Sequence, residues 1–289
     1  MTAEANAVGL HCTGTTRLFP IVGDPLDHVR APSWFSAYFQ ERGMATLCVP
    51  MAVTPPELSA AISGLGAAKN VDGVCITMPH KTCAAAFCKT LSPTSQRTGM
   101  VSALRRKPDG SWHGHSTDGE AFLKALTDHG ATIAGADILL LGAGGAGSAI
   151  AVALLEAGAA RLAIFDTEKA RTQDLIRRLD GLPGMIEAVE TPDPSAFQVI
   201  CNATPLGLEA DDEPPLALDL LHADLFVGDV IAGVEETPLI AAARARGCAT
   251  ADGDAMVRAV LDIMTDFWPR HGVHRMVGPP GLEPGTNGL

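Results

Sequence analysis

Residues 137–166 constrain the fold of this chain more than any other stretch. In order, they read as an apolar strand, a glycine-rich turn, an alanine-rich helix and a second apolar strand that ends on an acid. These segments are Ile138–Leu141, Gly142–Gly147, Ala149–Ala157, Leu162–Phe165 and Asp166. Glycine lets the backbone approach a pyrophosphate, a helix start presents unpaired N–H groups, and the acid can accept bonds from ribose hydroxyls. The stretch predicts a βαβ unit that binds a dinucleotide, in preference to a glycine turn used only for packing.

Asp166 also bears on which dinucleotide is bound. A carboxylate at this position bonds a free 2′-hydroxyl and repels a 2′-phosphate. Thr167 and Glu168, which follow it, offer no arginine to offset that repulsion, although Lys169 and Arg171 lie close by in the sequence. We therefore expect NAD to be preferred over NADP.

Length and charge narrow the class of partner. The 289 residues are enough for about two domains of ordinary size, each with its own core. The formal net charge is −12, and this excess of acid argues against nucleic acid or an anionic membrane as a partner, because both attract basic surfaces. We expect a small-molecule substrate, no nucleic acid, no membrane, and a monomer or homodimer.

Cysteine usage and the absence of long apolar runs indicate the compartment. The seven cysteines lack the paired close spacing of a zinc site, and reduced, mostly buried thiols are typical of the cytoplasm. No run of 18 apolar residues occurs, and residues 1–16 lack the pattern of an export signal. We expect a cytoplasmic protein without a metal, since the His-x-His pair His113 and His115 has no acid or thiol cluster beside it in the sequence.

Strands alternate with helices on both sides of the glycine-rich unit. Before it we expect strands at 18–22, 45–49 and 73–77 and helices at 32–42, 55–65 and 80–89. After it we expect helices at 170–179, 238–246 and 255–268 and strands at 199–201, 225–230 and 249–252. Such alternation is typical of α/β proteins, and the strands before the glycine-rich unit need a sheet of their own.

We expect the division into domains to follow these two sheets. The first domain spans 17–118, the second spans 119–254, and residues 255–275 pack back on the first. Residues 1–16 and 278–289 are expected to be disordered tails, because the C-terminal segment from Gly278 is rich in glycine and proline and too polar to bury much surface.

Five motifs occur in the order found in the shikimate/quinate dehydrogenase family. They are IVGDPL (21–26), GVCITMPHK (73–81), STDG (116–119), GAGGAG (142–147) and NATPLG (202–207). Over residues 18–268 the chain therefore resembles this family. The resemblance implies an N-terminal α/β substrate domain and a Rossmann-type dinucleotide-binding domain, with the active-site cleft between them. It also implies reversible oxidation of a ring alcohol to a ketone, with hydride passed to the nicotinamide.

The resemblance further implies a catalytic pair. In the family, the lysine of Thr-x-Pro-x-Lys and the aspartate of Thr-Asp-Gly do the acid–base work, and these positions are Lys81 and Asp118 here. When hydride leaves a carbinol, the hydroxyl proton must leave as well. A lysine can accept that proton while a neighbouring carboxylate orients it. Taken by itself, Lys81 would be interpreted as a solvated lysine at the start of a helix. Pro79 before it and the matching Asp118 favour a catalytic role for it instead.

Other contacts with the coenzyme follow from the same resemblance. The residues expected to line it are Gly142, Gly144, Gly145, Ala146, Gly147, Asp166, Asn202, Thr204, Pro205, Leu206, Val230, Gly253 and Met256. A packing role is equally open for Val230 and Met256. His80, next to Lys81, is expected to be a solvated residue at the start of a helix.

The family's polar contacts with substrate are mostly missing from this chain. The family's Ser-x-Ser-Pro turn reads His28-Val29-Arg30-Ala31-Pro32 here, so both serine hydroxyls are absent. Two asparagines of the family are replaced at Cys75 and Ser102, a glutamine at Val260 and a tyrosine at Ala232. Thr77 remains, Ser102 is a smaller substitute, and the fork of Arg30 could hold a carboxylate. We expect these three residues to bind substrate.

Two hypotheses account for these departures. Each unpaired hydrogen-bonding group commonly costs about 1–3 kcal/mol, so the losses together would abolish ordinary affinity for shikimate. The chain could keep the chemistry and act on a shikimate- or quinate-like acid with fewer hydroxyls or a different charge. It could instead be a dinucleotide-binding module without turnover. The intact Lys81 and Asp118 favour an NAD(P)-dependent oxidoreductase.

Overall fold

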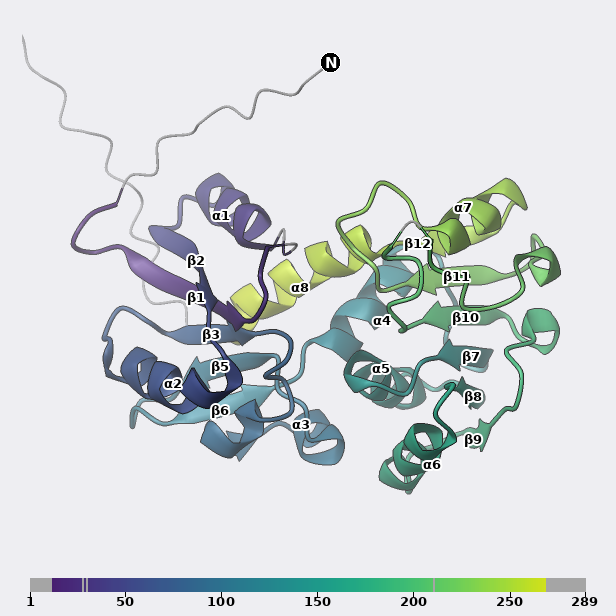
Figure 1. The fold of residues 1–289 in the computed structure, drawn as a ribbon, viewed down its shortest axis with the longest axis horizontal. Helices are drawn as coiled ribbons and strands as arrows, with labels where there is room; N and C mark the ends of the chain where they lie inside the picture. Colours follow the sequence, from purple (N-terminus) through teal and green to yellow (C-terminus); the bar gives the residue numbers. More distant parts are fainter. Residues whose placement is uncertain (1–11, 28, 30, 210, 269–289) are drawn as a thin grey trace, which may run out of the picture.

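The computed structural model describes residues 12–27, 29, 31–209 and 211–268. These residues form two lobes, each built on a six-stranded sheet (Figure 1). Helices alternate with the strands in both lobes, so the predicted α/β class is confirmed. None of the helices in the described part of the chain is long and apolar enough to cross a membrane. The expected terminal tails fall largely on residues 1–11 and 269–289, which lie outside the described residues.

The sheet of the N-terminal lobe is mixed, with the strand order β2-β1-β3-β5-β6-β4. Its strands are β1 (Arg17–Gly23), β2 (Thr46–Ala52), β3 (Gly73–Ile76), β4 (Cys88–Leu91), β5 (Ala103–Arg106) and β6 (Trp112–His115). The helices of this lobe are α1 (Ala31–Glu41), α2 (Leu58–Ala67) and α3 (Pro93–Thr98), with two 3₁₀ turns, η1 (Pro55–Glu57) and η2 (Ala84–Phe87). Strands β1, β2 and β3 pair in parallel, whereas β5 runs antiparallel to β3 and β6.

The sheet of the C-terminal lobe is parallel throughout, with the order β12-β11-β10-β7-β8-β9. Its strands are β7 (Asp137–Leu141), β8 (Arg161–Phe165), β9 (Met185–Ala188), β10 (Val199–Asn202), β11 (Phe226–Asp229) and β12 (Ala249–Ala251). The helices are α4 (Asp118–Asp128), α5 (Gly145–Glu156), α6 (Lys169–Arg178), α7 (Pro238–Ala245) and α8 (Gly253–Phe267), with 3₁₀ turns η3 (Pro194–Ala196) and η4 (Leu218–Leu220). The strand order reverses between β7 and β10, and open α/β sheets bind ligands at the carboxyl ends of the strands at such a point.

Helix α8 contributes to the cores of both lobes and runs from one to the other (Figure 1). Ala255, Met256 and Ala259, near its start, are buried with the strands and helices of the C-terminal lobe. Leu261 and Met264, nearer its end, are buried in a cluster with the aromatic residues of β1 and α1. One amphipathic helix therefore fixes the two sheets relative to each other.

The lobes also meet directly, through two arginines. Arg97, in the last turn of α3, donates to the main-chain carbonyls of Arg178 and Asp180, at 2.8 Å each. Arg178, the last residue of α6, donates in return to the carbonyl of Thr98, the last residue of α3, at 3.0 Å. We call this reciprocal contact of Arg97 and Arg178 the arginine clasp. Each guanidinium caps the carboxyl end of the other lobe's helix.

The predicted helix at 80–89 is wrong. The chain turns through residues 78–83, continues as η2 and then forms β4, which pairs in parallel with β6. In an α-helix the carbonyl of Lys81 would accept the N–H of Ala85, but here it accepts the N–H of Val101 at 2.9 Å. Tertiary hydrogen bonds thus outweigh the helix preference of the three alanines 84–86.

Candidate active site

The two residues expected to form the acid–base pair are in contact. Lys81 Nζ donates to Asp118 Oδ2 at 2.5 Å, although 37 positions separate the two residues in the chain. The Asp118 side chain is 9% exposed and the Lys81 side chain 22%, so both are sheltered and the lysine still reaches solvent. A lysine in this position can give a proton to a small molecule as an ammonium or accept one as a neutral amine, with the carboxylate beside it to orient the nitrogen.

Asp118 is held by the way its helix begins. It is the first residue of α4, and the preceding Thr117 is fully buried. Ser102 is 2% exposed, its hydroxyl accepts the N–H of Thr117 at 2.8 Å, and it lies 3.0 Å from the Thr117 hydroxyl. Ser102 therefore supports the start of α4, where Asp118 lies. Its expected contact with substrate stays a prediction.

The glycine-rich loop lies next to the same region. A Cβ atom added to Gly119 would lie 2.2 Å from the carbonyl oxygen of Ala149 in α5, the helix that this loop begins. A Cβ atom on Gly145 would lie 2.2 Å from Cε of Met100, whose neighbour Val101 bonds to the carbonyl of Lys81. These contacts bring the Lys81–Asp118 pair and the loop to the junction of the lobes.

Within the loop, glycine is required on steric grounds. Gly142 has φ +98°, in the left-handed region, and a Cβ atom there would lie 2.9 Å from the carbonyl of Ala203. A Cβ atom on Gly147 would lie 2.0 Å from the carbonyl of Gly142. Gly144 has open space around it and is exposed, so backbone at this point is accessible to a ligand. The loop fits the close approach of a pyrophosphate.

Asp166 lies where the acid of a dinucleotide site is expected, just past β8. Its Oδ2 accepts the N–H of Ala143 and its Oδ1 accepts the N–H of Glu168, both at 2.8 Å. The carboxylate is thus oriented by the glycine-rich loop itself, and each oxygen keeps a lone pair for a further donor.

The nearby cations are already paired with carboxylates. Arg171 Nη2 lies 2.7 Å from Glu168 Oε1, and Lys169 Nζ forms an ion pair with Glu190. All four side chains are exposed. Cations paired in this way offer little net charge to a 2′-phosphate next to Asp166.

Most of the remaining coenzyme candidates follow strands β10 and β11 at their carboxyl ends. Asn202 is fully buried, and its Oδ1 accepts the N–H of Thr204 at 3.1 Å and the Thr204 hydroxyl at 2.7 Å. Pro205 is exposed, while Ala146, Leu206 and Val230 are half-buried.

The start of α8 lies close to the loop after β11. A Cβ atom on Gly253, its first residue, would lie 2.2 Å from the carbonyl oxygen of Ile231, and Met256 is buried one turn later. Direct coenzyme contacts of these residues stay predictions.

His80 is not a solvated residue. It is 1% exposed, and its Nε2 donates to the carbonyl of Val53 at 2.6 Å. The bond ties the segment that carries Lys81 to the chain just after β2. Nothing in the sequence indicates this burial, because the partner of His80 is 27 positions away in the chain.

Two of the positions that replace the family's polar substrate contacts lie in an apolar cluster. Cys75 and Val260 both pack against the buried residues around Phe19 and Ile21. Burial raises the pKa of the Cys75 thiol to about 12, so it is a neutral thiol and no nucleophile. Thr77, directly after β3, remains half-buried beside it. Arg30 and His28 lie outside the described residues.

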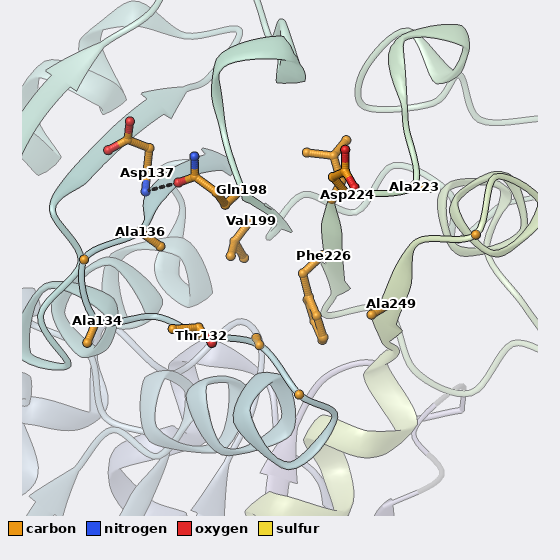
Figure 2. A pocket seen from close by; sticks show the side chains of 15 residues that line it. Thr132, Ala134, Ala136, Asp137, Gln198, Val199, Ala223, Asp224, Phe226 and Ala249 are labelled. Atoms are coloured by element: carbon orange, nitrogen blue, oxygen red, sulfur yellow. Dashed lines mark hydrogen bonds between the residues drawn. The ribbon is translucent and has the colours of Figure 1, made fainter.

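An open hollow of about 630 Å³ lies elsewhere, at the amino-terminal edge of the parallel sheet (Figure 2). Its lining includes Asp137, Val199, Phe226 and Ala249, which are the first residues of β7, β10, β11 and β12. Ligands of open α/β sheets bind at the opposite, carboxyl edge. None of the expected site residues lines this hollow, so its size does not make it the active site.

Comparison with known proteins points to one group. Residues 21–104 match the family model described as shikimate dehydrogenase substrate binding domain. A protein named shikimate dehydrogenase (NADP(+)) from Rubrobacter xylanophilus is 35% identical over 249 residues, which cover 84% of this chain and 87% of the relative.

Two solved structures show how far the likeness extends beyond one substrate. The ligand-free 5-ketofructose reductase of Gluconobacter superposes with a TM-score of 0.82 at 26% identity and covers 88% of this chain and 92% of its own. Quinate dehydrogenase from Corynebacterium glutamicum, solved in complex with NAD, has a TM-score of 0.75 at 27% identity and covers 90% of this chain and 97% of its own.

Proposed function

The chain belongs to the shikimate dehydrogenase family, and from this premise we propose that Lys81 and Asp118 are the acid–base pair of its reaction. The reaction class is that of the family: oxidoreduction at a CH–OH group with a nicotinamide dinucleotide. The observation that carries the proposal is the bond of 2.5 Å between the two side chains, next to a glycine-rich loop that fits a pyrophosphate.

The roles of the residues follow from their chemistry. The bound nicotinamide supplies or receives the hydride. Lys81 Nζ accepts the proton of the substrate hydroxyl during oxidation and returns it during reduction. Once Lys81 is protonated, Asp118 holds its ammonium group in position and offsets the charge. Thr117 and Ser102 keep the start of α4 in place. Thr77 offers a hydroxyl to the substrate from the end of β3.

We further propose that NAD is preferred over NADP. The support is local: Asp166 is oriented by the N–H of Ala143, and Lys169 and Arg171 are each paired with a glutamate. A 2′-phosphate at this position would meet a carboxylate with no unpaired cation on these segments to offset it. The curated relative from Rubrobacter carries NADP in its name, and the quinate dehydrogenase structure holds NAD, so the family uses both.

Asp166→Asn tests this preference. The amide keeps an oxygen that can accept the Ala143 N–H but removes the negative charge. We expect the ratio of kcat/KM for NAD to kcat/KM for NADP to fall by about tenfold or more, which corresponds to about 1.4 kcal/mol of lost repulsion. Glu187→Gln, on the neighbouring strand β9, is the control, because Glu187 is paired with Arg161 away from the loop. An unchanged ratio in Asp166→Asn would refute the role of this carboxylate.

The substrate that we propose is a small hydroxy acid with fewer hydroxyls than shikimate. Cys75 and Val260 turn apolar groups toward the cluster around Ile21, where the family has amides. A hydroxyl without a hydrogen-bond partner costs about 1–3 kcal/mol, so each superfluous hydroxyl on a substrate would weaken its binding.

A panel of acids tests this expectation through nicotinamide absorbance. Shikimate, quinate and cyclohexane carboxylates with a single ring hydroxyl are compared with the wild-type protein. We expect kcat/KM for the best monohydroxy acid to exceed that for shikimate by about tenfold or more. In Cys75→Asn the order should move back toward shikimate. If the wild type preferred shikimate, the proposal of a substrate with fewer hydroxyls would be contradicted. If none of the acids were turned over, the hypothesis of a dinucleotide-binding module without turnover would be favoured.

The cellular location that we propose is the cytoplasm. All seven cysteines are free thiols in the structure, including buried Cys201 and Cys248, and free thiols are typical of reducing compartments. A monomer or a homodimer remains our proposal for the state of assembly.

A further inference from the structure

Asp229 is a buried carboxylate that the proposed chemistry does not use. It is the last residue of β11 and 0% exposed, and it pairs across the parallel ladder with Asn202, the last residue of β10. A buried carboxylate is costly unless it accepts several hydrogen bonds, so its partners show what it does in the fold. A single acid at the end of a strand belongs to no motif, so the sequence alone gives no sign of its role.

Three segments donate to this one carboxylate. Asn202 Nδ2 donates to Oδ1 at 3.0 Å, and the N–H of Ile231, in the loop after β11, donates to the same oxygen at 3.0 Å. The hydroxyl of Thr237 donates to Oδ2 at 2.8 Å. Thr237 is also the N-cap of α7, because its Oγ1 accepts the N–H of Ile240 at 3.3 Å. The carboxylate therefore joins the end of β10, the loop after β11 and the start of α7.

One of the segments fixed in this way, the one that follows β10, borders the glycine-rich loop. The other end of the Asn202 amide accepts both the N–H and the hydroxyl of Thr204. Ala203 and Thr204 lie against Gly142, where an added Cβ atom would be 2.9 Å from Ala203 O and 3.0 Å from Thr204 Cγ2. A shift of Asn202 would move the segment that faces the dinucleotide site.

We propose that Asp229 is a positioning residue for the dinucleotide, because its carboxylate fixes the segment after β10, which borders the glycine-rich loop, to the loop after β11 and the start of α7. The inference rests on the proposed function only in taking this loop as the coenzyme site. Asp229 would then affect the affinity for the coenzyme through the segments that it holds, without itself contacting the coenzyme or the substrate.

The position predicts a dependence on pH. Burial raises the pKa of the Asp229 carboxyl to about 6, against the opposing effect of the donors Ile231, Thr237, Asn202 and Val230. No charged side chain of the described residues is among the groups that shift it. Above about pH 6 the ionised group accepts all three bonds. Below it the carboxyl carries a proton, one oxygen becomes a donor, and one of the three partners loses its acceptor.

The experiment measures the dissociation constant of NAD by calorimetry from about pH 7.5 down to about pH 5. NAD is the probe because the 2′-phosphate of NADP itself titrates near pH 6. For the wild type we expect the constant to rise by about tenfold as the pH falls by about one unit below 6. Asp229→Asn mimics the protonated carboxyl, so its constant should be about tenfold higher at neutral pH and should no longer change with pH.

Two further variants separate positioning from loss of the fold. Thr237→Val removes one donor and should weaken NAD binding, while Thr237→Ser keeps the hydroxyl and should restore it. Asp193→Asn is the matched control: Asp193 caps η3 on the amino-terminal side of β10 by accepting the N–H of Ser195, and its loss should leave the constant unchanged. Thermal unfolding of each variant shows that it is folded.

The outcomes distinguish this inference from the proposed function. A pH-dependent constant that becomes flat in Asp229→Asn supports the inference even if no hydroxy acid is oxidised. A wild-type constant that is flat between about pH 5 and pH 7.5 overturns it even if turnover is rapid. Persistence of the pH dependence in Asp229→Asn overturns it as well.

Discussion

Lys81→Met is expected to lower kcat by about three orders of magnitude, because general acid–base catalysis by a positioned side chain contributes about 10²–10⁴-fold. Methionine keeps the length and most of the volume of the lysine side chain but cannot carry a proton. Asp118→Asn should lower kcat too, since the amide oxygen cannot offset the ammonium charge. The measurement is steady-state turnover with the best acid of the panel, at several pH values.

The chain offers a matched control for this prediction. Lys89 and Asp109 form another lysine–aspartate pair of the N-terminal lobe, at 2.8 Å, but both side chains are exposed. Lys89→Met should leave kcat unchanged. The double variant of Lys81 and Asp118 should be no slower than the worse single variant, because residues that act as one unit are not additive. A Lys81→Met protein within about tenfold of wild-type turnover would refute the assignment.

Gly119→Ala is expected to lower the free energy of unfolding by about 1–3 kcal/mol, the usual cost of an overpacked site. The added methyl group would lie 2.2 Å from the carbonyl oxygen of Ala149, which is main chain and cannot rotate away. Helix α4 would have to move off α5 and take Asp118, its first residue, with it. Turnover should therefore fall together with stability. Urea unfolding measures the first effect and absorbance the second.

Gly64→Ala is the control for the same exchange. Gly64 lies inside α2, and a Cβ atom there would have nothing within 4 Å. Alanine favours a helix over glycine by about 0.5–1 kcal/mol, so this variant should be slightly more stable than the wild type. Equal effects of the two substitutions would mean that α4 and α5 are not in the close contact that the structure gives them.

The dinucleotide unit was predictable because its signals are local. A strand, a glycine turn, a helix and an acid follow one another within residues 137–166, and each is fixed by its neighbours in the chain. Lys81 and Asp118 each lie in a short motif, so both could be identified from the sequence. Their contact at 2.5 Å agrees with the pairing that the resemblance implies.

What could not be predicted depends on distant partners. The strand β5 ends in two arginines, a poor signal for a buried sheet, yet Arg106 donates to the carbonyls of Val71, Leu65, Gly66 and Ala68 around the end of α2. Asp229 was missed for the same reason. Its partner Asn202 is the neighbouring strand's last residue, and only the register of β10 and β11 brings the two together.

The arginine clasp has a further consequence. Across the lobes, both guanidiniums bond to main-chain carbonyls, so the acceptors of the clasp itself carry no formal charge; the ion pair of Arg178 with Asp174 lies within α6. Dissolved ions therefore have little to screen at this joint, in contrast to an exposed ion pair. Residues 98 and 180 would still offer their main-chain oxygens after most substitutions. The clasp therefore adds to the packing of α8 a second contact between the lobes, and this contact depends on the side chains of Arg97 and Arg178 rather than on those of its acceptors.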